Sequence, residues 1–449
     1  MKSSKVMAAL VTLGLAAAVA TPAMALENQF SGSFTSFYDL SNYSAVYGQK
    51  DPVNNAPTEN YFVQRARLGY TAKASDSVKL VTLFELDYRF LGNSSYANGR
   101  NTGGALGADS VNIETKNIFL ELNYPELKTK IGMQGVDDAF KGTIFSADMA
   151  GIQFGHNYNN AGVAAGFFRW NDSGEAYGLG KKANDMFMLD AKYNLSKDLK
   201  VGAAYYFIKD DRSNGTTITP VGAPTGYTAN GDPIYAAVTT TANPDNDVKV
   251  HTLGLNAEGV FGPLTLNGFV VKQFGDYNAT TTARGYEINV GARYNLGEAG
   301  TARSEFLYVS GGKDVFFNAD NGNEGGGFYD NEMVILGRDK NALTLDAAIV
   351  FDGSNRGQGV IVGSLGYDYT FTNKLSASAN AGFAAVAKNI KGAGSSDYLG
   401  TEINAETNYK LNPNVNLGVR AGYVVLGDYF KGTSADNPYD LKVLAKFSF

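Results

Sequence analysis

Apolar and polar residues alternate along segments of about ten residues from one end of the chain to the other. The last segment shows the pattern most clearly, because alternate positions hold Tyr439, Leu441, Val443, Ala445, Phe447 and Phe449, while Lys442, Lys446 and Ser448 lie between them. Successive side chains of a strand point to opposite faces. Each segment therefore predicts a β-strand with one apolar and one polar face.

The connections between these segments alternate between short and long. Residues 74–77 and 125–126 form tight turns, whereas residues 91–110 and 211–246 form long polar loops. Aromatic residues stand repeatedly at the apolar positions beside the short turns, namely Tyr70, Tyr124, Tyr193, Tyr294, Phe371 and Tyr409. Short turns at one end, long loops at the other and an aromatic girdle are typical of a transmembrane β-barrel.

Charged residues occupy the polar face of the predicted strands. In the stretch FVQRARLGYTAKASDSVKLVTLFELDYRF, residues 62–90, these charges are Arg65, Arg67, Glu85, Asp87 and Arg89. A packed interior would have to neutralise or pair each of them, whereas a water-filled lumen hydrates them. The sheet must also close, because an open edge in hydrocarbon would leave backbone groups unpaired. The pattern predicts an all-β, antiparallel barrel with its apolar face outside.

Eighteen strands can be placed between residues 29 and 449. The difficult region is 312–355, in which residues 341–351 have the composition of a strand, a short helix or a loop folded into the pore. We treat this region as a loop and retain 16 strands as the alternative, since bacterial barrels of this kind have an even strand number. Barrels of 16 to 18 strands are wide enough to enclose an aqueous channel.

The beginning of the chain has the features of a secretory signal peptide. Lys2 and Lys5 precede an apolar stretch and the small-residue site Ala23-Met24-Ala25, so we predict a signal peptide over residues 1–25 and one barrel domain over residues 26–449. Without Lys2 and Lys5, 36 of the 38 basic residues face 44 acidic ones, a net charge of −8 that argues against a nucleic-acid partner.

The sequence offers no constellation for catalysis or for a cofactor. It contains no cysteine, which excludes disulfides, cysteine-bound metal and covalent haem attachment. Its two histidines, His156 and His251, fall in different predicted strands and in no nucleophile or metal motif. We therefore expect neither an enzyme nor a resident metal or cofactor, although a barrel enzyme with serine or aspartate chemistry is the remaining enzymatic alternative.

Three segments carry a family resemblance: RARLGYTAKASDSVKLVTLFELDYRF, TKIGMQGVDDAFKG and the terminal LKVLAKFSF. Together they resemble the Gram-negative outer-membrane porins. The resemblance implies an outer-membrane homotrimer whose third external loop, residues 135–149, folds inward and sets carboxylates against arginines of the wall. The implied constriction residues are Arg65, Arg67, Arg89, Glu85, Asp87, Asp137, Asp138 and Asp148. The loop lacks the P-E-F-G-G-D signature of the enteric porins, which leaves the identity of its carboxylates open.

Each of these residues has a structural interpretation beside the functional one. Arg65 and Arg67 can form cross-strand ion pairs with the neighbouring strand, and Asp137 and Asp138 can be solvated loop residues. We expect Trp170 to anchor the barrel at the membrane interface. Tyr206 and Phe269 are the candidate aromatic residues of a solute path, and they are few.

The expected function is passive diffusion of ions and small hydrophilic solutes through a charged constriction. Because the polar face carries 11 basic and 11 acidic wall residues, we do not expect the wall to impose strong ion selectivity. Excess acid in the loops would favour cations at the mouth. Two other functions remain open: a substrate-specific channel, and a barrel that sheathes a partner such as a cytochrome in a transmembrane conduit.

Overall fold

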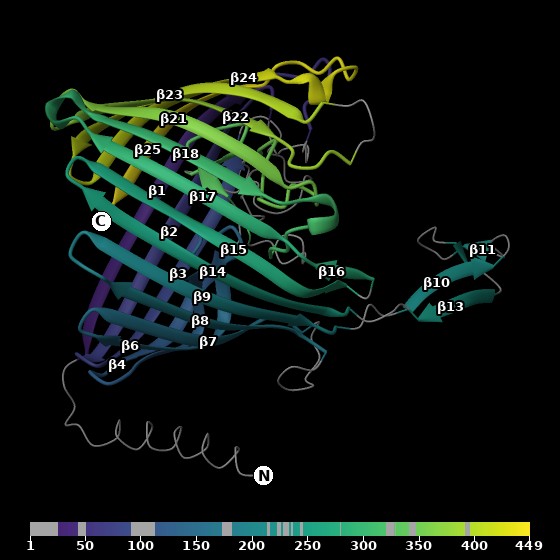
Figure 1. The fold of residues 1–449 in the computed structure, drawn as a ribbon, viewed down its shortest axis with the longest axis horizontal. Coiled ribbons are helices and arrows are strands. Elements are labelled where there is room, and N and C mark those ends of the chain that lie inside the picture. The colour runs from purple at the N-terminus through teal and green to yellow at the C-terminus, as the bar shows by residue number, and fades with distance from the viewer. Residues whose placement is uncertain are drawn as a thin grey trace, which may run out of the picture.

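The computed structural model describes residues 26–43, 51–90, 113–172, 182–212, 246–278, 280–319, 327, 329–340, 347–390 and 396–449. It also describes the short strands β10 (Thr216–Val221), β11 (Gly226–Tyr227), β12 (Pro233–Ile234) and β13 (Ala237–Ala242), which extend from the long-loop end in Figure 1. The predicted signal peptide lies outside the described residues. Among those residues, no helix has the length and apolar character that crossing a membrane requires.

Eighteen antiparallel strands form a closed barrel (Figure 1). The first strand pairs with the second on one side and with the last on the other, which closes the ring. The strands are β1 (Glu27–Ser41), β2 (Glu59–Ser75), β3 (Val78–Phe90), β4 (Ile113–Asn123), β5 (Lys128–Asp137), β6 (Ser146–Tyr158), β7 (Ala161–Asn171), β8 (Asn184–Asn194), β9 (Leu199–Asp210), β14 (Val248–Phe261), β15 (Leu264–Asn278), β17 (Tyr286–Asn295), β18 (Thr301–Val309), β21 (Val360–Thr370), β22 (Leu375–Ala385), β23 (Tyr398–Asn412), β24 (Val415–Leu426) and β25 (Tyr439–Ser448). The predicted closed barrel of 18 strands is confirmed.

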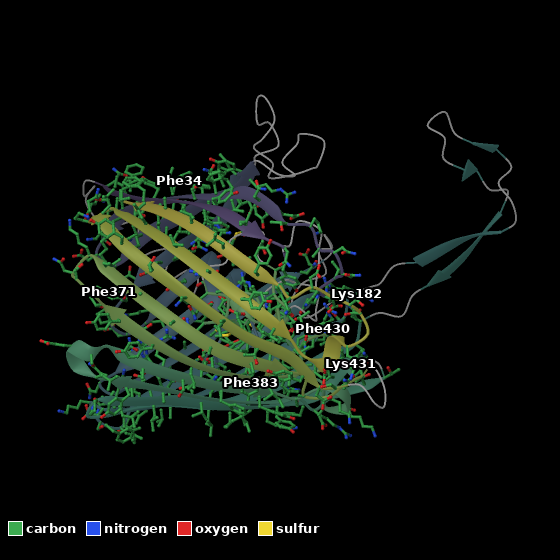
Figure 2. All side chains as sticks on the ribbon, turned by 90° about the horizontal axis from the view of Figure 1, so that it is seen from above. Phe34, Lys182, Phe371, Phe383, Phe430 and Lys431 are labelled. Atoms are coloured by element: carbon green, nitrogen blue, oxygen red, sulfur yellow. The ribbon has the colours of Figure 1, made fainter. Side chains whose placement is uncertain are left out.

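The alternation along each strand places apolar side chains on the outside of the barrel. Phe34, Phe371 and Phe383 are exposed on this surface, as Figure 2 shows. In β17, Ile288 and Val290 are exposed while Glu287 and Asn289, between them, are buried on the lumen side. The outer face is therefore the apolar one, as a surface in contact with lipid requires.

Aromatic side chains form part of a girdle beside the short turns. Tyr124, Tyr193, Tyr294, Phe371 and Tyr409 are all exposed at strand ends next to these turns. Their rings combine an apolar body with, in the tyrosines, a polar tip, which suits the boundary between hydrocarbon and water. Their positions are those that the sequence pattern predicts.

Two loops at the other end of the barrel fold into the lumen. We call residues 138–145, between β5 and β6, loop A, and the described residues within 310–359, between β18 and β21, loop B. Loop B includes the 3₁₀ helix η4 (Gly312–Asp314) and the short parallel pair β19 (Asp330–Asn331) and β20 (Arg338–Asp339). The structure thus confirms an inward loop and adds a second one in the region where the sequence pattern was ambiguous. Within residues 341–351, the described part, 347–351, belongs to loop B.

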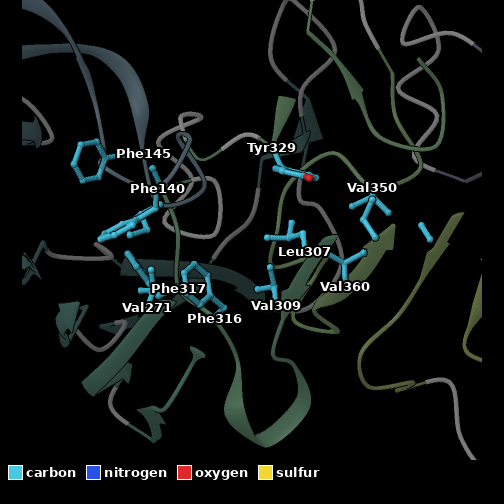
Figure 3. Close-up of a cluster of buried hydrophobic side chains, with 14 of the residues drawn as sticks. Phe140, Phe145, Val271, Leu307, Val309, Phe316, Phe317, Tyr329, Val350 and Val360 are labelled. Carbon is cyan, nitrogen blue, oxygen red and sulfur yellow. The ribbon is translucent and has the colours of Figure 1, made fainter. Parts of the chain in front are cut away.

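The two loops and the inner wall share a cluster of buried apolar side chains (Figure 3). Phe140, Ile144 and Phe145 come from loop A, and Phe316 and Phe317 come from loop B. The backbone N–H of Ala319 in loop B donates to the carbonyl oxygen of Ile144 in loop A at 2.8 Å, which joins the loops directly. The lumen therefore contains a hydrophobic core of its own, beside the polar surface that remains open.

Candidate pore constriction

Five of the eight predicted constriction residues meet in one ion-pair network on the lumen face of β2 to β6. Arg65 lies opposite Asp87, and Arg67 lies opposite Glu85, across the β2–β3 ladder. Arg65 donates to both carboxylate oxygens of Asp87 at 2.7 and 2.5 Å, and its Nε lies 3.3 Å from Glu85. Arg67 Nε lies 2.5 Å from Glu85 Oε2. The fifth predicted member, Asp148 on β6, joins through a residue that the sequence pattern did not identify.

That residue is Lys116, which links the β2–β3 pairs to Asp148. Its Nζ lies 3.5 Å from Glu85 and 2.8 Å from Asp148, and Asn117 Nδ2 donates to Asp148 at 2.9 Å. Lys116 has the same parity as the exposed, outward-facing Ile118. A β-bulge between β3 and β4, at Leu83 and Phe84, accounts for its inward position because the extra residue interrupts the alternation. A strict count by parity could not have found it.

The β2–β3 part of the network presents its cations to the lumen and covers its two carboxylates. The side chain of Arg67 is 38% exposed, whereas those of Glu85 and Asp87 are only 3% and 6% exposed. Three cations, Arg65, Arg67 and Lys116, balance three carboxylates, so the formal charge is zero. The accessible edge is nevertheless positive, because the guanidinium groups lie between the buried carboxylates and the water.

The remaining three predicted residues lie apart from this network. Asp137, at the end of β5, accepts a hydrogen bond from the hydroxyl of Ser146 at 2.6 Å. Arg89 lies opposite Val63 near the long-loop end of β3, and its buried Nη1 has no hydrogen-bond partner among the residues that the structure describes. The third residue, Asp138, organises loop A.

Asp138 accepts four backbone N–H groups of its own loop. Its Oδ1 accepts from Phe140 at 2.6 Å and Gly142 at 3.0 Å, and its Oδ2 accepts from Ile144 at 2.7 Å and Phe145 at 2.9 Å. Burial raises the pKa of Asp138 to about 6, and the four donors limit that rise because they favour the carboxylate. The carboxylate thus points back into the loop and fixes its shape.

Loop A crosses the lumen from β5 and β6 to the opposite wall. Phe140 is fully buried against Tyr206 and Phe269, with ring centroids 6.0 and 5.5 Å apart. The ring lies over Gly254. A Cβ at this position would lie 2.3 Å from the ring, so only glycine leaves enough space for Phe140. The backbone N–H of Ala139 donates to the hydroxyl of Tyr206 at 2.8 Å. Tyr206 and Phe269 therefore hold the loop rather than line a solute path.

The tip of loop A reaches β17 and β18. Thr143 donates to Glu287 at 2.9 Å, and the ammonium group of Lys141 lies 2.6 Å from Glu305 Oε1. Both carboxylates belong to the wall, so the loop is fixed at its base by apolar packing and at its tip by polar contacts. This arrangement narrows the passage on the side where loop A lies.

Loop B is fixed to strands β23 and β24 of the wall, in part by a buried carboxylate. Glu402 on β23 accepts the backbone N–H groups of Val334, Ile335 and Leu336 at 2.7, 3.0 and 2.6 Å. Further along the loop, Asp339 forms an ion pair with Arg420 on β24. Charge-assisted hydrogen bonds of this kind are stronger than those between neutral groups. Loop B is consequently held close to β23 and β24.

A polar cavity of about 130 Å³ remains between the two loops and the wall. Its charged lining comes from loop A, the wall and loop B, namely Lys141, Arg293, Arg303, Glu305 and Glu332. Arg303 is paired with Asp368 at 2.7 Å and with Glu332 at 3.1 Å. A small hydrophilic solute would meet both signs of charge here.

The position of Trp170 differs from the interface anchor that we predicted. Its indole Nε1 points to the sulfur of Met149 at 3.2 Å, and its ring contacts Phe145 of loop A in an edge-to-face arrangement. The side chain therefore packs on the lumen side. The prediction was wrong because Trp170 was assigned by its place near a strand end, whereas the parity of β7 turns it inward.

The described residues contain no group of histidine and carboxylate side chains with the geometry of a metal site. His251 is stacked between Phe207 and Phe274 on the outer face, with ring centroids 4.5 and 5.0 Å away. His156 lies next to Tyr158, whose exposed side chain shares its face of β6. Neither histidine belongs to the ion-pair network described above.

Comparison with known proteins identifies the fold. No family model matches the chain, and no curated protein matches it. Solved structures of outer-membrane porins match it over nearly its full length. The chain has the fold of these porins. Pseudomonas aeruginosa OccK5 (OpdH) is 13% identical, with a TM-score of 0.55 over 94% of this chain and 98% of that one.

Two further structures give the same result. Pseudomonas aeruginosa OccK2 (OpdF), solved in complex with glucuronate, is 12% identical, with a TM-score of 0.56 over 94% of this chain and 98% of that one. Acinetobacter baumannii OccAB1 is 13% identical, with a TM-score of 0.56 over 94% of this chain and 96% of that one. At these identities the likeness establishes the porin fold, and the function is inferred from the chain's own lumen.

Proposed function

We propose that the protein is an outer-membrane channel for passive diffusion of ions and small hydrophilic solutes. The observation that carries this proposal is the inverted barrel, which is apolar outside and has a charged lumen narrowed by two inward loops. Opposed charges at a narrow point orient water, which raises the barrier for apolar molecules that must displace it. A charged lumen that is accessible to water therefore supports a channel.

The proposed constriction contains Arg65, Arg67, Glu85, Asp87 and Asp148, together with Lys116. Arg89 contributes a further cation nearer the mouth, while Asp137 and Asp138 act by supporting loop A. Cross-strand pairing and a constriction role are compatible here, because the pairs fix the cations in place while Arg67 still faces water. We expect weak overall ion selectivity, since the network carries no net charge.

The inward loops also distinguish between the alternative functions. A barrel that sheathes a cytochrome would need an unobstructed lumen, whereas loops A and B occupy this one. The polar cavity lined by Lys141, Arg293 and Arg303 instead supports a second candidate, a channel with preference for a small anionic hydrophilic solute. Glu305 and Glu332 in the same lining would restrict the number of anionic groups that such a solute can present.

The homotrimer that the family resemblance implies is part of the same proposal. The outer surface is apolar around the ring, so lipid and neighbouring copies can both contact it. Native mass spectrometry of the detergent-solubilised protein measures the number of copies. A single copy under conditions that preserve the folded barrel would overturn the trimer without affecting the channel.

Single-channel conductance of refolded residues 26–449 in a planar bilayer tests the function. We expect stepwise, ohmic conductance and a reversal potential near zero in a salt gradient. Measuring ion conductance with added neutral or carboxylated sugars of equal size tests the second candidate. A specific site would bind one class of sugar, and that class alone would reduce the conductance at low concentration. Absence of current from a barrel whose folding has been verified would reject the open channel.

A further inference from the structure

Both inward loops contact one carboxylate of the wall, that of Glu305 on β18. Its Oε1 lies 2.6 Å from the ammonium group of Lys141 in loop A and 3.1 Å from the hydroxyl of Tyr329 in loop B. Asn289 Nδ2 on β17 donates to the same oxygen at 2.9 Å. Three separate segments of the chain therefore converge on a single oxygen atom in the narrow part of the lumen.

The backbone of loop A does not depend on this contact. Phe140 is buried in its own pocket, and Asn256 Nδ2 donates to the carbonyl oxygen of Ala139 at 3.2 Å. Lys141 and Gly142 form a tight turn in the left-handed region, with φ angles of 64° and 76°. Loss of the Glu305 carboxylate would consequently release the lysine side chain while the loop that carries it remains docked.

The other carboxylates near Lys141 are either paired or covered. Glu332 in the cavity lining is paired with Arg303 at 3.1 Å and with Lys340 at 2.6 Å, and Glu287 is fully buried. The cavity also contains the cations Arg293 and Arg303. The side chain of Lys141 is 37% exposed, so it borders the open passage. If Glu305 lost its charge, the ammonium group would be repelled by the two arginines and would extend into the water-filled passage.

We propose that Glu305 determines the ion selectivity of the channel by holding Lys141 against the wall. In this arrangement the carboxylate neutralises the ammonium group and keeps it out of the path of permeating ions. Tyr329 links loop B to the same point, so the separation of the two loops is set there as well. This inference rests on the proposed channel function and adds a specificity-determining residue to it.

A pair of neutralising substitutions tests the proposal. Glu305→Gln and Glu258→Gln each remove one negative charge from the lumen wall, and Glu258 also has a lysine partner, Lys200, at 3.0 Å. We expect Glu305→Gln to shift the reversal potential toward anions more strongly than Glu258→Gln, and to increase fluctuations of the open-channel current. Equal shifts from the two variants would overturn the proposal, because a simple loss of wall charge would then explain both.

A double-mutant cycle separates the effect of the Glu305–Lys141 ion pair, which we call the tether, from the effect of the Glu305 charge itself. In a Lys141→Met background, the additional effect of Glu305→Gln should fall to that of Glu258→Gln, because no ammonium group remains to be released. Tyr329→Phe removes the contact from loop B without a change of charge, and we expect it to alter current fluctuations but not the reversal potential. An effect of Glu305→Gln that is undiminished without Lys141 would contradict the tether.

Chemical labelling gives a measurement that does not depend on conductance. A small, water-soluble, amine-reactive reagent should modify Lys141 several-fold faster in Glu305→Gln than in the unmodified chain, as measured by peptide mass mapping. An unchanged rate at Lys141, with Lys200 as the internal reference, would show that Glu305 does not hold the ammonium group. If Lys141 is labelled faster in Glu305→Gln but the folded wild-type barrel carries no current, the channel proposal fails, while the contact between Glu305 and Lys141 is confirmed.

Discussion

The pocket that receives Phe140 makes the docking of loop A open to a quantitative test. Phe140→Ala would remove a fully buried ring from its contacts with Tyr206, Phe269 and the surface above Gly254. Replacing a buried phenylalanine by alanine typically costs about 3–5 kcal/mol. Since the wall strands keep their own hydrogen-bond ladders, we expect this cost to weaken docking of the loop rather than to unfold the barrel.

A loss of about 3 kcal/mol corresponds to a change of roughly a hundredfold in the docking equilibrium. The polar contacts of Thr143 and Lys141 remain, so we expect the loop to exchange between docked and released positions. Single-channel recording should then show a larger maximal conductance, with transitions to the wild-type level. The variant should unfold at the same temperature as the unmodified barrel, as measured by circular dichroism.

Phe154→Ala provides the matched control, because this phenylalanine is exposed on the outer face of β6. It removes the same ring from a surface that does not contact loop A. We expect its conductance to equal that of the unmodified protein. If Phe140→Ala also left conductance and current fluctuations unchanged, loop A would not limit the passage, and the proposed narrowing would be refuted.

Three further predictions concern loop B, the single tryptophan and the arginine pair. Glu402→Gln weakens three charge-assisted hydrogen bonds to residues 334–336, so we expect faster proteolysis within that segment by a small protease, measured by mass spectrometry. Trp170 should show blue-shifted fluorescence that brominated lipids do not quench, because its ring faces the lumen core. Arg65→Ala together with Arg67→Ala should move the reversal potential toward cations, because Glu85 and Asp87 lose their covering charges.

Each of these predictions has a clear contrary result. Equal rates of cleavage within residues 334–336 in Glu402→Gln and in the unmodified protein would show that Glu402 is not the main anchor of loop B. Efficient quenching of Trp170 by lipid would place the ring outside, as we first expected from the sequence. A reversal potential that is unchanged or moves toward anions in the double arginine variant would remove that network from the constriction.

Most of the wall could be predicted because each strand carries its own local pattern. Alternation sets the two faces of a strand independently of every other strand, so the number of strands and the inward position of Arg65 and Glu85 follow from short segments. The cross-strand pairs follow as well, since Arg67 lies opposite Glu85 in a hairpin with a tight turn. Short-range information was sufficient for these features.

The interior required information that no short segment contains. Lys116 could not be assigned because a β-bulge reverses its expected side. Loop B could not be placed because the groups that hold it are distant in sequence. Glu402, for example, is separated from Leu336 by 66 residues. The contacts of Asp138 could not be assigned for a related reason, since the loop A backbone becomes its environment only after the loop has folded.

The alternation along β17 allows its lipid-facing and lumen-facing residues to change independently in evolution. Ile288 and Val290 determine how the strand meets lipid, while Glu287 and Asn289, on the same ten residues, determine how it meets loop A and β18. A substitution at an inward position can therefore alter what passes through the barrel without affecting its insertion into the membrane. An extra residue in the strand would instead exchange the two faces beyond it, unless a β-bulge absorbs it, as one does at Lys116 on β4. Diversification of such a channel is thus expected by substitution in the strands and by changes of length in the loops or at bulges.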